Sequence, residues 1–191
     1  MIPALERAIG RLLHDVRAGD EHLACNAPGL CDRPASIRLT SPAFADGAMM
    51  PQRLAGARLG DNLSPPLEWA NLPPASVELA LVMQDPDAPL PRPVTHLIVV
   101  GIAPERPGFA EGELAAGAGE TIRFGEGFRG RIGYAGPGPV RGHGPHRYVF
   151  QVFALVRRIA VPPVFGIDAL VAAMRGSVLA KGSLTGVYEQ A

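Results

Sequence analysis

The sequence predicts a mainly β domain, and three observations support this. The 191 residues include 23 Gly and 20 Pro, so specified turns are frequent. The chain is nevertheless 47% apolar, which excludes disorder. Val77 to Gln84, Val94 to Val100 and Arg147 to Arg158 are short, β-branched and apolar on both alternating faces, as in central strands covered on both sides. We expect one domain over 1–191, since no repeat or long linker interrupts it.

Charge and hydropathy exclude several classes of partner. Eighteen basic and eighteen acidic residues give a formal charge of zero, so no nucleic-acid partner is expected. The sequence contains no run of eighteen apolar residues, so stable membrane insertion is not expected. The polar first residues predict a cytoplasmic location. Cys25 and Cys31 are too few for a zinc knuckle or a disulfide framework, and we interpret both as thiols.

Residues 1–19 are predicted to form an amphipathic helix. Pro3 suits a first turn and Gly19 a stop. Its apolar residues at helical spacing are Ile2, Leu5, Ile9, Leu12, Leu13 and Val16. This face could pack on the domain, contact a second copy or lie on a membrane surface, and we favour the first. Residues 20–35 are expected to be irregular.

The remaining pattern supplies further elements. Ser36 to Thr40 alternates as a strand, and Asp46-Gly47 indicates a turn. Gly60 to Trp69 contains two consecutive prolines and is expected to be extended, with Trp69 in the core. Phe109 to Gly130 lacks periodicity and is predicted as loop.

Near the end of the chain, a short helix is predicted from Asp168, as its N-cap, through Met174. Gly176 would terminate it. Val178 to Val187 is expected to form a helical turn followed by a strand.

A corner between a loop and a strand is the main candidate site. In Gly133 to Phe153 a glycine-proline loop runs directly into His146, Arg147 and Tyr148. Glycines allow a backbone to approach a ligand closely, and the side chains can donate hydrogen bonds, which favours a small anion site.

Strand parity sorts the polar residues around this corner. His146 and Tyr148 share one face of an extended strand, whereas Arg147 points to the other, where a structural ion pair is expected. Asp85 and Asp87 flank Pro86 and are expected to project together. His96 lies in an apolar strand, so it needs a polar partner, for which the two aspartates are the obvious choice.

The order of these motifs resembles the phosphatidylethanolamine-binding protein family, which includes Raf kinase inhibitor proteins and small bacterial homologues. The matching motifs are Asp85-Pro-Asp-Ala-Pro89, the histidine at 96, Gly138-Pro139, and His146-Arg-Tyr-Val-Phe150. Asn62 to Trp69 and Val178 to Tyr188 also resemble family segments. The resemblance runs from about Gly60 to the C-terminus and leaves the N-terminal helix outside it.

The resemblance implies two packed antiparallel sheets in a sandwich, with peripheral helices and a shallow pocket at one end. The pocket of the family holds phosphate, acetate or a phosphorylated head group, without metal or cofactor. The ligand-binding residues implied for this chain are Asp85, Asp87, His96, Gly136, Gly138, Pro139, His146 and Tyr148.

Two features modify this expectation. Carboxylates repel an anion, so at least one aspartate should orient a histidine or meet the ammonium of a zwitterionic ligand. The pocket histidine has non-aromatic neighbours, Thr95 and Leu97, and Val140 replaces a family proline. The pocket is therefore expected to be wider and more aliphatic.

The sequence therefore predicts a non-catalytic binding protein for an anionic or phosphorylated small ligand such as phosphate or a phosphoethanolamine-type head group. A kinase or protease partner and a homodimer are further predictions. Two alternatives remain. The Asp/His cluster could hold a metal ion and hydrolyse a substrate, or the corner could be a protein-interaction module with a vestigial pocket.

Overall fold

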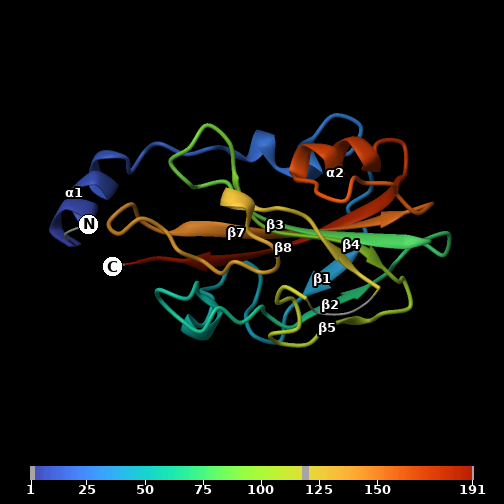
Figure 1. Cartoon of the computed structure of the whole chain (residues 1–191), viewed down its shortest axis with the longest axis horizontal. Helices are drawn as coiled ribbons and strands as arrows, with labels where there is room; N and C mark the ends of the chain where they lie inside the picture. The colour runs from blue at the N-terminus through green and yellow to red at the C-terminus, as the bar shows by residue number, and fades with distance from the viewer. Residues whose placement is uncertain (1–2, 118–120, 191) are drawn as a thin grey trace.

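Two antiparallel sheets pack face to face in the computed structural model, which describes residues 3–117 and 121–190 (Figure 1). The small sheet has the order β1 (Arg38–Thr40), β2 (Leu67–Ala70), β5 (Gly108–Phe109). The large sheet has the order β6 (Arg123–Phe124), β4 (Val94–Ile102), β3 (Glu78–Asp85), β7 (His146–Leu155), β8 (Val178–Tyr188). The predicted fold class is confirmed.

The helical elements are short. The two α-helices are α1 (Pro3–Leu12) and α2 (Ile167–Met174), and the 3-10 turns are η1 (Asp20–His22), η2 (Ala24–Asn26), η3 (Gln52–Leu54) and η4 (Phe128–Gly130). Neither α-helix of residues 3–117 and 121–190 has the length and apolar character needed to cross a bilayer.

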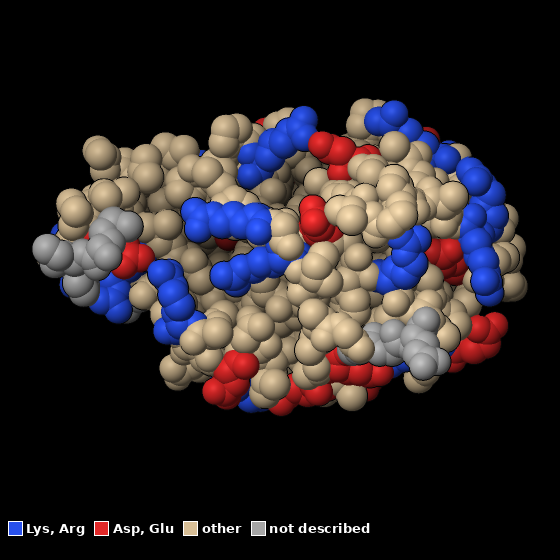
Figure 2. All heavy atoms as spheres, in the orientation of Figure 1, with Lys and Arg blue, Asp and Glu red and all other residues tan. Residues whose placement is uncertain are grey.

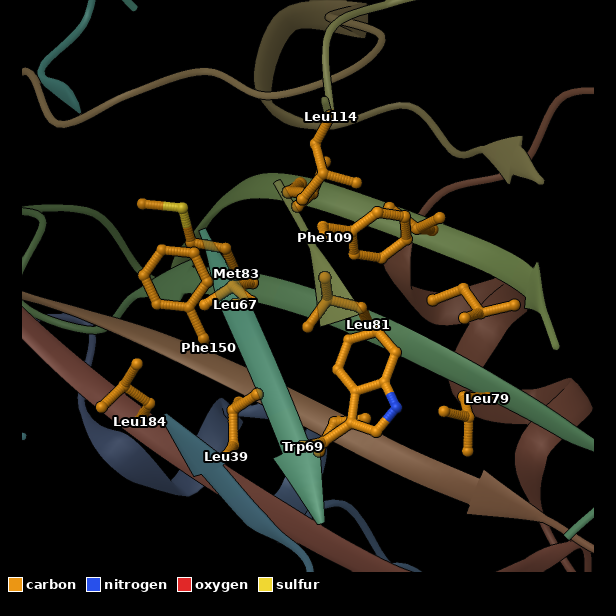
Figure 3. Close-up of a cluster of buried hydrophobic side chains, with 14 of the residues drawn as sticks. Leu39, Leu67, Trp69, Leu79, Leu81, Met83, Phe109, Leu114, Phe150 and Leu184 are labelled. Atoms are coloured by element: carbon orange, nitrogen blue, oxygen red, sulfur yellow. The ribbon is translucent and has the colours of Figure 1, made fainter. Parts of the chain in front are cut away.

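The main core lies between the two sheets. Figure 3 shows Leu79, Leu81 and Met83 of β3 together with Trp69 and Phe109 of the small sheet. The Trp69 and Phe109 rings meet edge to face with centroids 5.6 Å apart. Trp69 is 7% exposed, as predicted, and its indole N–H donates to the Arg106 carbonyl at 2.7 Å. A buried indole needs such an acceptor.

A second core covers the opposite face of the large sheet. Ala80 and Val82 alternate with the β3 residues of the first core and cluster with Leu170 and Met174 of α2. Figure 1 shows α2 and the N-terminal segment on this same side of the sheet. All eight residues of β3 are buried because both faces are covered, which explains why its sequence lacks polar alternation.

Two predictions at the C-terminal end need correction. Val178–Tyr188 is one continuous strand without a helical turn, because it pairs with β7 along its length. Asp168 lies in the first turn of α2 but does not cap it. The N-cap is Gly166, and the carboxylate of Asp168 pairs instead with Arg92 at 3.2 Å. Gly176 follows the helix at φ +70°, as its role of terminator predicts.

Two segments predicted to be irregular contain short elements. Phe109 to Gly130 includes β6 and η4 and the end of β5, while its residues 118–120 lie outside the described part. Residues 20–35 contain η1 and η2. Elements of two or three residues are too short to leave a periodic pattern in the sequence.

Helix α1 contacts the domain through a glycine and not through its apolar face. A Cβ on Gly10 would collide with the Arg141 carbonyl oxygen, so the helix backbone lies directly on the corner loop. Leu5, Leu12 and Val16 are 54%, 83% and 46% exposed. The predicted packing of the apolar face on the domain is therefore wrong for these residues. The helix also ends at Leu12 and not at the predicted stop, Gly19, and Ile2 lies outside the described residues.

The position of the core leads us to predict that two phenylalanines contribute very differently to the free energy of unfolding. Phe150 is fully buried in the main core, whereas Phe128 in η4 is 43% exposed. Phe150→Ala should lower the free energy of unfolding by about 3–5 kcal/mol, since it removes apolar contacts and leaves a cavity. Phe128→Ala should change it by less than about 0.5 kcal/mol. Urea unfolding followed by circular dichroism would measure both, and similar losses would contradict this assignment of the core.

Candidate functional site

The turn after β3 places two buried carboxylates at the end of the large sheet. Asp85 ends the strand, and its Oδ1 accepts a hydrogen bond from the backbone N–H of Asp87 at 2.8 Å. Asp85 and Asp87 are 4% and 3% exposed. They pair with different residues of β7, because neighbouring positions of that strand point to opposite faces. His146 binds Asp85, and Arg147 binds Asp87.

Asp87 is held by two guanidinium groups. Its Oδ2 accepts from the Arg147 backbone N–H at 2.7 Å and from its Nε at 2.9 Å, and its Oδ1 accepts from Arg147 Nη2 at 2.9 Å. Arg17 Nη1 lies 3.2 Å from Oδ1. Burial favours a higher pKa for Asp87, but the hydrogen bonds and charges of Arg147, with the charge of Arg17, outweigh it and lower the pKa. The ion pair predicted for Arg147 is present.

A chain of hydrogen bonds leads from Asp85 to the N-terminal segment. Asp85 Oδ2 lies 2.8 Å from His146 Nδ1, and His146 Nε2 lies 2.8 Å from His143 Nδ1. His143 Nε2 then donates to the Leu13 carbonyl at 2.8 Å and lies 3.2 Å from that of Val16. His146 and His143 are both buried. Figure 1 shows α1 beside the loop that precedes β7.

The acceptors in this chain determine where the protons lie. Carbonyl oxygens cannot donate, so His143 carries a proton on Nε2. Burial lowers the pKa of His143, and the nearby His146 lowers it further, which favours a neutral ring with Nδ1 as acceptor. His146 must then donate from Nε2 to His143, and its Nδ1 is hydrogen-bonded with the Asp85 carboxyl group. Both His146 nitrogens are therefore engaged within the protein, one by Asp85 and one by His143.

His96 has a different partner from the one predicted. Its Nδ1 donates to the Ala135 carbonyl at 2.6 Å and not to either aspartate. Burial lowers the pKa of His96, and the charge of Asp85 opposes this, while His146 and Arg131 lower it further. The ring is therefore neutral near pH 7. Its Nε2 makes no hydrogen bond within the described residues.

Tyr148 lies beside His96 with its hydroxyl unpaired. The two rings meet edge to face with centroids 5.2 Å apart. Tyr148 is fully buried, and its hydroxyl has no hydrogen-bond partner among residues 3–117 and 121–190. Burial raises the pKa of Tyr148 well above its usual value, and Asp85 adds to this. The backbone N–H of Gly138 is close enough to lower the pKa of Tyr148 in part, although it is not placed to make a hydrogen bond with the hydroxyl.

The glycines of the corner loop differ in role. A Cβ on Gly136 would collide with the backbone of the segment after η3, so this glycine serves packing. Its N–H donates to Asn62 Oδ1 at 2.8 Å, which anchors the loop. Gly138 is exposed and would meet no atom within 4 Å, which leaves open space beside the loop. Pro139 is buried.

The site thus collects most of the predicted residues and adds some. Asp85, His96, His146 and Tyr148 form one group, with Gly138 close to the tyrosine hydroxyl. Asp87 turns away to Arg147. Sequence reasoning missed Arg17 and His143. The spacing of three residues between His143 and His146 within a Gly-Pro turn is a signal that could have identified His143.

No group of three or more His, Cys, Asp or Glu side chains within the described residues is arranged to hold a metal ion. Surface cavities of about 500 Å³ and about 330 Å³ lie on the α2 side of the large sheet. Neither is lined by a predicted ligand-binding residue.

The comparisons with known proteins establish the family. The family model described as "Phosphatidylethanolamine-binding protein" matches residues 40–189. The chain belongs to this family. Residues 1–39, including α1, η1 and η2, precede the match.

Relatives and solved structures agree with this assignment. LppC of Mycobacterium tuberculosis, named as a candidate lipoprotein, is 39% identical over 160 residues, covering 82% of this chain and 75% of the relative. A protein of Aquifex aeolicus from the group UPF0098 is 33% identical over 157 residues, covering 82% and 90%. The crystal structure of Escherichia coli YbcL, described as a member of the mammalian family, has a TM-score of 0.75 at 25% identity, covering 81% and 99%.

The paired aspartate predicts a pH-dependent loss of stability. Asp87→Asn should lower the free energy of unfolding by about 1–3 kcal/mol near pH 7, because Arg147 loses an ionised partner. The pKa of Asp87 is lowered on folding, so its contribution is present above the unfolded pKa and lost as the pH falls through the folded one. The difference from the wild type should therefore shrink at about pH 3.

Urea unfolding at both pH values would measure this effect. Asp168→Asn is the matched control, because its pair with Arg92 is exposed and worth at most about 1 kcal/mol. A loss for Asp87→Asn no larger than that of the control would contradict the assigned role of the pair.

Proposed function

We propose that this member of the family is a binding protein for a small anionic or phosphorylated ligand, held beside Tyr148, His96 and the Gly138 loop. The observation that carries the proposal is the buried, unpaired hydroxyl of Tyr148. An unsatisfied buried hydroxyl is costly, and a donor of this kind pairs well with a phosphate or carboxylate oxygen. The open space beside Gly138 supports access to it.

Nearby groups supply positive potential. His96 has Nε2 free within the described residues, and protonation would turn this atom into a second donor. Arg131 is exposed and close enough to lower the His96 pKa. Figure 2 shows basic and acidic side chains interspersed among uncharged areas on the face in view, without a broad field of one sign, which agrees with local capture of a small anion.

Because both aspartates are paired within the protein, their repulsion of an anionic ligand is reduced. Asp85 is hydrogen-bonded with His146, and Asp87 is paired with Arg147 and Arg17. We therefore assign Asp85 and His146 the role of positioning the end of β7, where Tyr148 lies. The ammonium of a zwitterionic ligand would have to displace a guanidinium to reach Asp87, so recognition is proposed to rest on the anionic group.

Binding is favoured over hydrolysis by the engagement of the histidines. A metal site would need free imidazole nitrogens, but both nitrogens of His146 and of His143 have partners within the chain. Metal analysis of the purified protein tests the alternative, for which a stoichiometric zinc or manganese content would be required.

One observation favours the interaction-module alternative. Leu5, Ile9, Leu12 and Val16 expose an apolar stripe on and after α1, outside the family match. A second copy or a kinase or protease partner could cover it, and the monomer–dimer state in solution tests the former. Location also remains a proposal. The relation to LppC makes membrane association an alternative to the predicted cytoplasmic location, and cell fractionation would decide between them.

The tyrosine hydroxyl predicts a specific loss of anion binding. Tyr148→Phe should weaken phosphate and phosphoethanolamine binding about tenfold or more, because one hydrogen bond to a charged group contributes about 1.5–3 kcal/mol. Isothermal titration calorimetry would measure the affinities. Tyr134→Phe is the matched control, because the Tyr134 hydroxyl already donates to the Leu54 carbonyl at 2.9 Å.

The control should lose stability while keeping its affinity. Equal affinities of wild type and Tyr148→Phe for both ligands would overturn the proposal, as would absence of saturable binding to the wild type.

His96 predicts tighter anion binding at lower pH. A bound anion favours the cationic ring, so the complex takes up a proton that the free protein lacks, and affinity should rise as the pH falls. Sulfate isolates this effect because its charge is constant from about pH 8 to about pH 5.5, where histidine titrates. His96→Asn keeps a donor for Ala135 and should abolish the dependence, whereas His22→Asn should retain it. A pH-independent wild type would refute the role of His96.

A further inference from the structure

A second candidate site lies on the opposite face of the large sheet from Tyr148. The cavity of about 330 Å³ is bounded by the segment from Glu21 to Pro28, by α2, and by Gln84 of β3. Gln84 precedes Asp85, so its side chain points to the α2 side of the sheet. Figure 1 shows the N-terminal segment and α2 together on that side. The volume is at the lower end of the range of about 300–1,000 Å³ that is typical of small-molecule sites.

Two glutamines form a fixed polar element at this cavity. Gln84 Oε1 accepts from the Ala24 backbone N–H at 2.8 Å and from Gln151 Nε2 at 3.0 Å. Gln151 Oε1 accepts from the Cys25 N–H at 2.8 Å. Because backbone N–H groups can only donate, both amide orientations are determined.

The orientation leaves one donor unused. Gln84 is 2% exposed, lines the cavity, and donates no hydrogen bond from Nε2 within the described residues. Gln84 Nε2 is not among the fully buried unpaired atoms of the described residues, so this N–H group is accessible and can donate to an occupant of the cavity. The cavity thus has a hydrogen-bond donor held rigidly in its wall by the main chain of η2.

Charged and apolar groups complete the lining. Arg92 and Arg175 lie at the cavity, and Arg175 makes no ion pair within the described residues. Asp168 is already paired with Arg92, and the Glu21 carboxylate folds back against Gly19. The apolar part of the wall comes from Leu23, Ala24, Ala27, Ile167 and Val171.

We propose that this cavity binds a small monocarboxylate with an apolar body. The carboxylate would accept from Gln84 Nε2 and pair with Arg175, and the body would lie on the apolar wall. An amine would meet a donor and a guanidinium and be rejected. Residues 21–28 precede the family match, so the site depends in part on a segment outside that match. It is separate from the anion site proposed beside Tyr148.

Calorimetry with hexanoate and hexylammonium on the full chain tests the proposal. Hexanoate should bind saturably and hexylammonium should not. Gln84→Glu keeps an acceptor for Ala24 and Gln151 but replaces the free donor with a second negative oxygen, and should weaken hexanoate binding at least about tenfold. Arg175→Ala, a surface change, should weaken it several-fold, whereas the exposed Arg158→Ala should leave it unchanged.

Sulfate distinguishes the two sites. Excess sulfate should not displace hexanoate, and Gln84→Glu should bind sulfate as the wild type does. The proposal is overturned by absence of hexanoate binding, by equal binding of hexylammonium, by unchanged affinity in the folded Gln84→Glu and Arg175→Ala variants, or by displacement with sulfate. The same titrations in Tyr148→Phe, in which the other proposed anion site is impaired, should give unchanged hexanoate binding, so that failure of one proposal is distinguished from failure of the other.

Discussion

The need to pair two buried carboxylates at the end of β3 organises the whole corner. Asp85 and Asp87 leave water when the large sheet is covered on both faces, so each must find a hydrogen-bonding or ion-pair partner. Consecutive residues of β7 supply them, His146 on one face and Arg147 on the other. A slip of β7 by one residue would exchange these partners, so the ion pairs support the same register as the apolar core.

The same pairing separates the residues that hold the corner in place from those that are free to contact a ligand. Once His146 is engaged by both Asp85 and His143, the groups left for a ligand are the Tyr148 hydroxyl, one nitrogen of His96 and the backbone near Gly138. Most of the ionisable residues that are prominent in the sequence pair with one another and hold the corner in place. The proposed recognition atoms lie at its edge.

The sequence predicted the side-chain orientations that follow from strand alternation and from the order of motifs. It did not predict the hydrogen bonds that side chains make to backbone groups of distant segments. The opposite orientations of His146 and Arg147 followed from strand parity, and the burial of Trp69 from its apolar surroundings. The partner of His96 could not be deduced, because it is the carbonyl of Ala135 on a distant loop. For the same reason no side-chain pattern indicated that His143 binds the backbone after α1.

The N-terminal segment is attached mainly through its own backbone. The N–H groups of Ala18 and Gly19 donate to the carbonyls of Ala88 and Pro86 in the turn after β3, and those of Ala24 and Cys25 donate to the two glutamines. The Leu13 carbonyl accepts from His143. Attachment of this kind places few demands on side-chain identity. Substitutions at its exposed positions, other than Arg17 and Asp20, which pair with Asp87 and Arg147, can therefore alter the surface it presents, from the α1 stripe to the second cavity, without detaching it from the domain.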